Sequence, residues 1–586
     1  MSSTSTLTAK GGAWLLEETP AGAVFTPEKL TEEHKLIGQT TDEFMTNEVL
    51  PAIEQLEQKD WGLARNLLRR AGDLGLLATD VPEEFGGVGA DKTSSIIVAD
   101  RIGRSGSFSA AYGAQTSLCM MALVMFGTKD QKARYLPRLA SGEMVGAYAL
   151  SESGAGSDAL AAKTRAVRQS DGSFVLNGEK MWITNGGFAD LICVFAKVDG
   201  EHFSAFLVER AFPGVSAGKE EHKMGLHGSS TTPILLQEAR VPGENLLGEI
   251  GKGHKVAFNV LNYGRLKLAA GCNGGAKAVV GEASAYAKQR RQFGQPIANF
   301  GAIRHKLGEM VVRDYAVESM MYRTMGLIDG ALHASGSHEG QALVAAFEEF
   351  AIEASILKVA ASESLHYVLD ENVQIHGGNG FVHDYPAERH YRDSRVNRIF
   401  EGTNEINRLL IPGMLIRRAI KGSLPLIQAA KRLQDELLSP AAMDAAPSGP
   451  LGDERRAVAA MKKIALMVLG TAMQKYGEKL TDEQEVLCHA ADIIIETFAA
   501  ESALVRAAQG GNGLAVDAAR VTVSDGAARV EFSARQALAA MAEGDMLRTL
   551  LAALRRLMKV TPVNTVALRR NLAAAAIERT AYPFAV

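Results

Sequence analysis

One stretch, Arg398-Ile399-Phe400-Glu401-Gly402-Thr403-Asn404, places a single carboxylate directly before a glycine and a helix-capping residue. Gly402 permits a backbone turn that a side chain would hinder. Thr403 is a suitable N-cap for a helix that carries Leu409, Leu410 and Ile411 and that Pro412-Gly413 should end. The sequence therefore predicts that Glu401 lies on a turn immediately before a helix.

Two interpretations of Glu401 are open on these residues alone. In an apolar pocket, desolvation would raise the pKa of its carboxyl group toward neutrality, which suits a general base that removes a proton next to a carbonyl. On a solvated face, the same carboxylate would instead pair with Arg392, Arg395 or Arg398. The rest of the chain has to distinguish between them.

Length and charge exclude some classes of protein. The 586 residues exceed what a single core usually supports, so several domains are expected. The 63 Lys and Arg residues nearly balance the 67 Asp and Glu residues, for a net charge of -4. No overall basic field argues for nucleic acid as a partner.

The cysteines and the N-terminus bear on the compartment. Cys119, Cys193, Cys272 and Cys488 are far apart and form no CxxC pair, which argues against a disulfide framework or a structural zinc site. The first residues, MSSTSTLTAKGG, have neither the apolar core of a signal peptide nor the character of a transit peptide, and no apolar run is long enough to span a membrane. We expect a cytoplasmic protein.

Hydrophobic periodicity divides the chain into regions of different structure. Residues 31–145 show helical spacing after an acidic first turn, residues 146–250 contain strand-like runs, and alanine-rich helical segments return over residues 251–425. Within the strand region, Asn177-Gly178 is a strong hairpin signal. The order differs from the βαβ alternation of a Rossmann protein, so we predict an α+β fold with a short N-terminal segment at residues 1–30.

The C-terminal part is predicted to be a separate helical extension. Prolines and small residues between Ser439 and Pro450 indicate a linker, placed at residues 426–453, and the extension covers residues 454–586. One of its helices carries Leu547, Leu550, Leu551, Leu554, Leu557 and Met558 on one side and Arg548, Arg555 and Lys559 on another. This pattern favours packing on the main body, with peripheral contact to an anionic membrane surface as the alternative.

A glycine-rich loop marks the start of the strand region. Tyr148-Ala149-Leu150-Ser151-Glu152-Ser153-Gly154-Ala155-Gly156-Ser157-Asp158 combines small residues, which let backbone N–H groups approach a ring or phosphate, with hydroxyls. It is not the G-x-G-x-x-G dinucleotide fingerprint, because Ala159 stands in place of the third glycine and no βαβ unit surrounds it.

Five segments in order resemble the acyl-CoA dehydrogenase family, and the last resembles its very-long-chain branch most. They are the loop just described, Trp182-Ile183-Thr184, Arg290-Arg291-Gln292-Phe293-Gly294, Gln374-Ile375-His376-Gly377-Gly378-Asn379-Gly380-Phe381, and the stretch around Glu401, within residues 30 to 415. The resemblance implies an N-terminal helical domain, a middle β-domain, a C-terminal four-helix bundle and FAD as cofactor. In the family, the Gln374 segment receives the adenine half of FAD from a neighbouring subunit.

The resemblance assigns roles residue by residue. Glu401 would be the base, with Arg265 as a positive charge near the site, and Ser157, Asn262, Arg265, Phe400 and Gly402 would contact the substrate. The cofactor would be held by Tyr148, Leu150, Ser151, Gly156, Ser157, Trp182, Ile183, Thr184, Arg290, Gln292, Phe293, Gln374, Ile375, Gly377, Gly378, Thr403, Asn404 and Glu405. No metal site is expected, because no second ligand lies at a binding distance in sequence from His376.

Some family members carry the base instead on an earlier helix, just before an arginine. Here that place reads Asn262-Tyr263-Gly264-Arg265, and Gly264 cannot act as a base. Glu401 would therefore be the base. Leu118, Met120, Met121 and Met125 belong either to the ordinary core or to the wall of an acyl-chain tunnel.

The implied reaction is α,β-dehydrogenation of a long or very-long-chain fatty acyl-CoA to a trans-2-enoyl-CoA, as in the first step of β-oxidation. Glu401 would remove the α-proton, a hydride would go to flavin N5, and an electron-transferring flavoprotein would take the electrons. The extension implies a homodimer. An acyl-CoA oxidase that uses oxygen and a non-catalytic acyl-CoA-binding or assembly protein on the same fold are the alternatives.

Overall fold

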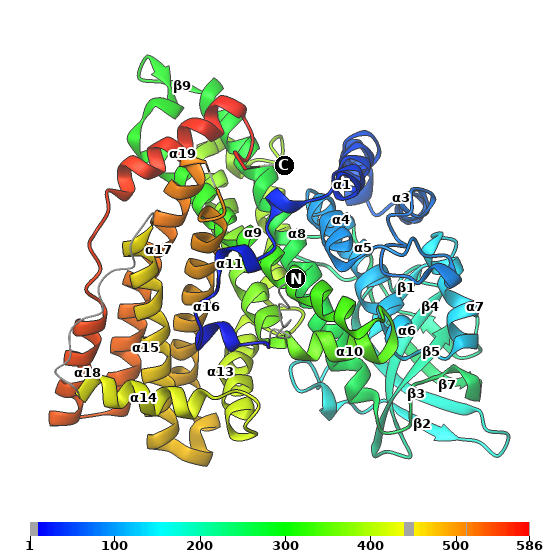
Figure 1. Cartoon of the computed structure of the whole chain (residues 1–586). Coiled ribbons are helices and arrows are strands. Elements are labelled where there is room, and N and C mark those ends of the chain that lie inside the picture. The colour runs from blue at the N-terminus through cyan, green and yellow to red at the C-terminus, as the bar shows by residue number, and fades with distance from the viewer. Residues whose placement is uncertain (1–9, 439–450, 511, 585–586) are drawn as a thin grey trace, which may run out of the picture.

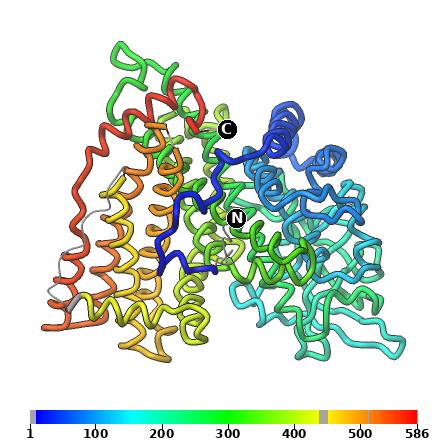
Figure 2. The backbone as a smooth tube through the Cα atoms, in the orientation of Figure 1, coloured from blue at the N-terminus to red at the C-terminus, as the bar shows by residue number. Residues whose placement is uncertain are grey.

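The computed structural model describes residues 10–438, 451–510 and 512–584 (Figure 1). The first residues of the N-terminal segment and residues 439–450 of the expected linker lie outside the described residues. Figures 1 and 2 show a β-domain at one side of the molecule, the extension at the other, and long helices between them. The predicted α+β fold is confirmed.

The N-terminal helical domain covers one side of the β-domain. It consists of α1 (Glu32–Phe44), α2 (Ile53–Glu57), α3 (Trp61–Asp73), α4 (Lys92–Ile102), α5 (Gly106–Gly113), α6 (Met121–Phe126) and α7 (Lys129–Ala140), with a π-helical segment at Ala114–Met120. The cap of α1 follows the sequence, because the Thr31 side chain accepts a hydrogen bond from the His34 backbone N–H. One apolar cluster lies largely within this domain, and its other buried residues belong to a larger core that continues into the rest of the chain.

The middle domain is an eight-stranded sheet with its own apolar core. Its strands are β1 (Gly146–Ala149), β2 (Arg165–Arg168), β3 (Phe174–Thr184), β4 (Leu191–Val198), β5 (His202–Glu209), β6 (Val215–Ala217), β7 (Thr231–Val241) and β8 (Leu246–Leu247). The order is β6-β7-β3-β2-β4-β5-β8, and β1 pairs with β4 in parallel.

The hairpin prediction at Asn177-Gly178 is wrong. Both residues lie inside the continuous strand β3, at a register shift against β7, and the β2–β3 hairpin turns earlier, where the Gln169 N–H bonds to the Ser173 carbonyl. A Cβ on Gly178 would lie 2.5 Å from the Thr164 hydroxyl, so glycine serves close packing at a bulge rather than a two-residue turn.

The bundle is built from α8 (Gly253–Gln289), α9 (Gly301–Ser335), α10 (Gly340–Glu349), α11 (Ala351–His376) and α13 (Asn404–Ile420), with α12 (Ala387–Ser394) leading into the Glu401 turn. The prediction that Pro412-Gly413 ends the last helix is wrong, because α13 continues to Ile420. Pro412 is buried with Ile411 and Leu415 against α11 and α16 (Gln484–Ala507), so packing outweighs the proline penalty of about 3 kcal/mol.

The extension packs on the bundle as part of the same apolar core. It contains α15 (Gly452–Tyr476), α16 (Gln484–Ala507), α17 (Gly513–Met541), α18 (Gly544–Leu557) and α19 (Thr565–Arg579). The expected linker is wrong in its first half, since Leu426–Leu438 forms helix α14, whose buried Leu426 and Leu433 join that core. On α18, Leu554 is buried and the other leucines of that side are partly buried against the core.

Two helical stretches, at residues 106–126 and 452–482, are long and apolar enough to cross a membrane by length and composition. In the structure, 78% and 72% of their apolar windows are buried inside the protein. This burial is the behaviour of core helices.

Candidate active site

Glu401 lies on a turn between α12 and α13, as the sequence predicts. Its φ of 57° is in the left-handed region, which a residue with a side chain occupies at a cost of about 1–3 kcal/mol, and Gly402 follows at 76°. Thr403 caps α13 by accepting the Ile406 N–H at 3.2 Å. The surrounding structure must therefore hold Glu401 in place.

Two polar side chains hold the turn. Asn407 donates its side-chain N–H groups to the carbonyls of Gly402, at 2.8 Å, and Thr403, at 3.0 Å. Arg265 donates to the Glu401 carbonyl at 3.2 Å and is itself held by Asn262 at 3.0 Å. Arg265 thus binds the backbone of Glu401 rather than its carboxylate. Sequence analysis missed Asn407, whose inward-facing position one turn into the helix was the available signal.

The carboxyl group of Glu401 is not part of a surface ion pair. Its Oε2 is buried without a hydrogen-bond partner in the part of the chain that the structure describes. Burial raises its pKa to about 7, against the opposing charges of Arg265 and Lys358. Arg392, one possible partner on a solvated face, pairs instead with Glu388 at 2.6 Å. The geometry favours the general base.

Lys358 is a second residue that sequence analysis missed. It is fully buried on α11 and donates to the Asn404 side chain at 2.6 Å, next to the Glu401 turn. Burial lowers its pKa to about 8. A lysine inside an alanine-rich helix, where most neighbours are apolar, was the signal that could have identified it.

The raised pKa of Glu401 predicts a pH-dependent rate. Only the carboxylate form can accept a proton, so proton abstraction should increase with pH and level off above about 7. An unshifted glutamate would be half-ionised near pH 4.5, so its rate would already be close to the plateau in mildly acidic solution. The measurement is the anaerobic reduction rate of the cofactor by a saturating acyl-CoA from pH 5 to 9. A flat profile over this range would contradict the assignment.

Gly264 packs directly against the Glu401 carboxylate. A Cβ at Gly264 would lie 2.8 Å from Oε2 of Glu401, closer than real contacts allow, and 3.1 Å from Oε1. A Cβ at position 264 would therefore occupy space that the Glu401 carboxylate fills. A side chain at 264 and the Glu401 carboxylate in its observed place exclude each other.

We expect Gly264→Ala to lower the rate without unfolding the protein. The methyl group would meet the end of a flexible side chain, which can move, and a displacement of about 1 Å costs roughly a hundredfold in rate. Gly330→Ala, inside helix α9 and outside the cavity lining, is the matched control, because its Cβ would meet no atom within 4 Å. Equal rates for the two variants, at equal thermal midpoints, would show that Glu401 tolerates displacement.

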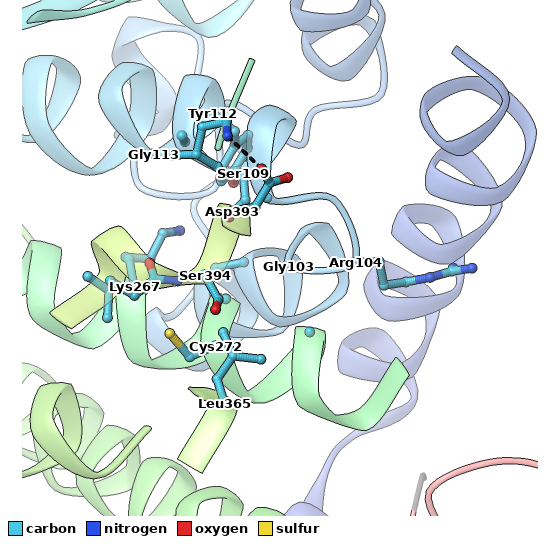
Figure 3. A pocket seen from close by; sticks show the side chains of 18 of the residues that line it. Gly103, Arg104, Ser109, Tyr112, Gly113, Lys267, Cys272, Leu365, Asp393 and Ser394 are labelled. Atoms are coloured by element: carbon cyan, nitrogen blue, oxygen red, sulfur yellow. Dashed lines mark hydrogen bonds between the residues drawn. The ribbon is translucent and has the colours of Figure 1, made fainter. Parts of the chain in front are cut away.

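A narrow cavity of about 180 Å³ extends from Glu401 between the N-terminal domain and the bundle (Figure 3). One wall is α8, with Gly264, Lys267, Gly271, Gly275, Val279 and Glu282. The opposite wall comes from Gly103 to Leu118 and includes Ser109 and Gly113, while α11 and α12 add Leu365, Leu369, His390, Asp393 and Ser394. The cavity follows α8 from Gly264 to Glu282 and its lining is mostly small and apolar; we call it the tunnel.

The alternatives for Leu118 and the methionines now separate. Leu118 is partly exposed and lines the cavity, together with Phe400 near the base. Met120, Met121 and Met125 are buried in the core and are absent from the lining. The three methionines are core residues.

The first two resembling segments lie side by side in the β-domain. The Met181 N–H bonds to the Ser151 carbonyl at 2.9 Å, and Lys180 donates to the Leu150 carbonyl. Thr184 lines the same cavity as Glu401, so these strands face the base.

The predicted cofactor residues of these segments differ in exposure. The Tyr148 hydroxyl is buried without a partner among the described residues, and Trp182, on β3, is 58% exposed. A Cβ on Gly154 or Gly156 would meet open space. Ile183 is buried and Ser157 exposed.

The third and fourth segments lie together at the far end of the bundle. Arg290, Gln292 and Phe293 form the small hairpin after α8, which Figure 1 shows beside α19, and Phe293 is 91% exposed. The Gln374–Phe381 segment ends α11 nearby, where Tyr286 stacks on His376 and bonds to its carbonyl. Gly377 and Gly378 have open space around them. The chain therefore presents two separate half-sites, with Ile375 buried beneath the second.

An exposed tryptophan, an orphaned tyrosine hydroxyl and open glycine loops beside a desolvated base fit a large aromatic cofactor. The fold and this site define the class of flavoproteins that dehydrogenate acyl thioesters. Patterns described as "Acyl-CoA dehydrogenase" N-terminal, middle and C-terminal domains match residues 31–143, 147–239 and 251–415, and a further C-terminal domain pattern matches residues 460–556. The chain belongs to the acyl-CoA dehydrogenase family.

Individual relatives agree over different lengths. A "Probable acyl-CoA dehydrogenase" of Bacillus subtilis is 49% identical over 98% of both chains. The human mitochondrial very long-chain specific enzyme is 40% identical over 61% of this chain and 53% of its own. A crystal structure of an acyl-CoA dehydrogenase from Bacillus anthracis, described as complexed with FAD, has a TM-score of 0.96 and 48% identity over 98% of this chain and 100% of that chain.

Proposed function

We propose that this enzyme converts long-chain fatty acyl-CoA to trans-2-enoyl-CoA with FAD as cofactor and Glu401 as the α-proton base. The observation that carries the proposal is the unpartnered, desolvated Glu401 carboxylate at the head of a long apolar tunnel. When bound, FAD accepts the β-hydrogen of the substrate as a hydride. Tyr148, Trp182 and Thr184 would contact it. The Tyr148 hydroxyl is buried without a partner among the described residues, Trp182 is exposed on β3, and Thr184 lines the cavity.

The residues of the chain would perform the acid–base half of the reaction. The backbone N–H of Glu401 has no acceptor among the described residues, so it is available for the thioester oxygen. Donors at such an oxygen stabilise the enolate-like charge that forms as the α-proton leaves, by roughly 3–4 kcal/mol each. Arg265 and Asn407 fix the turn that aims both this N–H and the carboxylate.

The tunnel supports a long acyl chain. From Gly264 to Glu282 the lining follows α8 for five turns, roughly 27 Å at the helical rise. The residues that face it on both walls are mostly glycine, alanine and serine, which leave room for a chain to extend. We therefore propose long-chain rather than short-chain substrates.

Gly113→Phe tests the chain length. A Cβ at Gly113 would meet no atom within 4 Å, so a larger side chain can enter the cavity without a backbone clash. We expect kcat/KM for long acyl-CoAs to fall at least tenfold while that for short ones is retained, because the added ring blocks the tunnel beyond Glu401. Equal loss for all lengths would show that acyl chains take another route.

The electron acceptor and the assembly are also proposals. We propose an electron-transferring flavoprotein as acceptor. We further propose a homodimer, in which the half-site of Arg290 and Gln374 completes the cofactor site of the other subunit, because the two half-sites of one chain lie apart.

The test is anaerobic titration of the purified yellow protein with acyl-CoAs of graded length. Bleaching of the flavin absorbance by long-chain acyl-CoAs supports the proposal. If no acyl-CoA bleaches the flavin, the result favours a non-catalytic binding or assembly protein. Oxygen consumption with the same substrates distinguishes a dehydrogenase from an oxidase. A dehydrogenase turns over slowly with oxygen alone and rapidly with electron-transferring flavoprotein, whereas an oxidase needs only oxygen.

A further inference from the structure

A second large cavity lies in the extension, apart from the residues around Glu401. It has a volume of about 900 Å³ and lies between residues 15–21 of the N-terminal segment and helices α14, α15, α16 and α18. Figure 1 shows these helices at the side of the molecule opposite the β-domain. The volume is within the range of roughly 300–1,000 Å³ typical of small-molecule sites. We call it the extension cleft.

The floor of the extension cleft is apolar and elongated. It follows one face of α15 from Arg455 through Ala459 and Lys462 to Leu466, twelve residues that span roughly 16 Å at the helical rise. Buried or nearly buried apolar side chains line it, namely Leu15, Leu433, Val458, Leu466, Leu504 and Val505. A floor of this length and composition fits an alkyl chain.

The lining is more basic than acidic. Six basic residues, Arg432, Arg455, Arg456, Lys462, Lys463 and Arg556, stand against Glu17, Glu18, Glu436 and Glu501. Several basic groups are already engaged, since Lys462 pairs with Glu501, Lys463 with Glu436, and Arg456 with Asp453.

Two guanidinium groups remain available. Within residues 10–438, 451–510 and 512–584, neither Arg432 nor Arg455 has an ion-pair or hydrogen-bond partner. Arg455 is half-buried, so its charge is less well solvated than that of an exposed arginine. A half-buried guanidinium beside an apolar floor is complementary to a carboxylate at the end of an alkyl chain.

We propose that the extension cleft binds a long-chain fatty acid, with its alkyl chain along α15 and its carboxylate on Arg455. A membrane surface fits less well, because the floor is recessed below charged side chains instead of standing out as an apolar face. The bound acid would contact the N-terminal segment, α14, α15 and α16 together. It would therefore stabilise the packing of the extension in proportion to its concentration.

The experiment measures palmitate binding by calorimetry to the holoenzyme saturated with an enoyl-CoA product, which fills the catalytic tunnel. Arg455→Met should weaken binding about tenfold or more by removing a charge-assisted hydrogen bond. Ala460→Trp should abolish it by filling the cleft. Arg548→Met, on the exposed Asp545 pair of α18, is the matched control and should bind as wild type does.

Three results would overturn the proposal. They are the absence of palmitate binding, equal binding by Arg455→Met and wild type, and equal binding of palmitate and its methyl ester. Sedimentation with phosphatidylglycerol vesicles tests the alternative that the cleft binds a membrane surface. Vesicle binding that depends on Arg455, without binding of free palmitate, would assign the cleft to a membrane instead. Because Glu401→Gln leaves the cleft intact, palmitate should bind that variant normally, whatever the catalytic outcome.

Discussion

Glu401→Gln is expected to abolish flavin bleaching by acyl-CoA while the protein remains folded and yellow. The amide cannot accept the α-proton, and loss of a positioned general base typically costs about a hundredfold to ten-thousandfold in rate. Binding should survive, because glutamine keeps the size of the side chain beside Gly264 and the backbone contacts of Arg265 and Asn407 do not involve the carboxylate.

The measurement is stopped-flow reduction under anaerobic conditions with a saturating long-chain acyl-CoA, wild type against variant. Glu201→Gln, on an exposed turn of the β-domain, is the matched carboxylate control and should react at the wild-type rate. The rise in rate with pH should also disappear in Glu401→Gln. Reduction of that variant at the wild-type rate would mean that another group removes the proton.

The stability of Glu401→Gln distinguishes a catalytic role of Glu401 from a role in folding. Burial of an unpaired carboxyl group is unfavourable, and Glu401 also occupies a left-handed backbone conformation. We therefore expect Glu401→Gln to unfold no earlier than wild type on heating. A catalytic loss together with unchanged or improved stability is the signature of a residue retained for chemistry.

The sequence predicts the local features of the site well. The Glu401 turn and the Thr403 cap follow from three adjacent residues, because backbone turns and helix caps depend on neighbours in the chain. The sequence does not distinguish Leu118, which lines the tunnel, from the methionines, which lie in the core. All of these side chains are apolar, and only packing decides which of them faces the cavity.

Features that depend on distant contacts were missed or wrong. Lys358 meets Asn404 across 46 positions, which no local pattern reveals. Pro412 has the usual signal of a helix end, yet the packing of α13 against α11 and α16 keeps it inside the helix. Asn177-Gly178 has the usual signal of a hairpin, but the pairing of β3 with β7 places it in a bulge. In each case tertiary packing overrides a local preference.

Arg506→Met is expected to destabilise the protein by about 3 kcal/mol, the lower end of the usual cost of removing one partner of a buried ion pair, because Lys277 and the Tyr582 hydroxyl still contact Glu318. Arg506, on α16, is 3% exposed, donates to Glu318 of α9 at 2.8 Å, and lies over the Tyr315 ring at 4.4 Å. It also donates to Glu28 of the N-terminal segment at 2.9 Å. One side chain therefore joins the extension, the bundle and the N-terminus.

The loss should appear as a lower denaturant midpoint. Arg529→Met is the control, since its pair with Glu496 lies at the surface and should contribute less than about 1 kcal/mol. Equal midpoints for Arg506→Met and Arg529→Met would mean that Lys277 and Tyr582 satisfy Glu318 without Arg506.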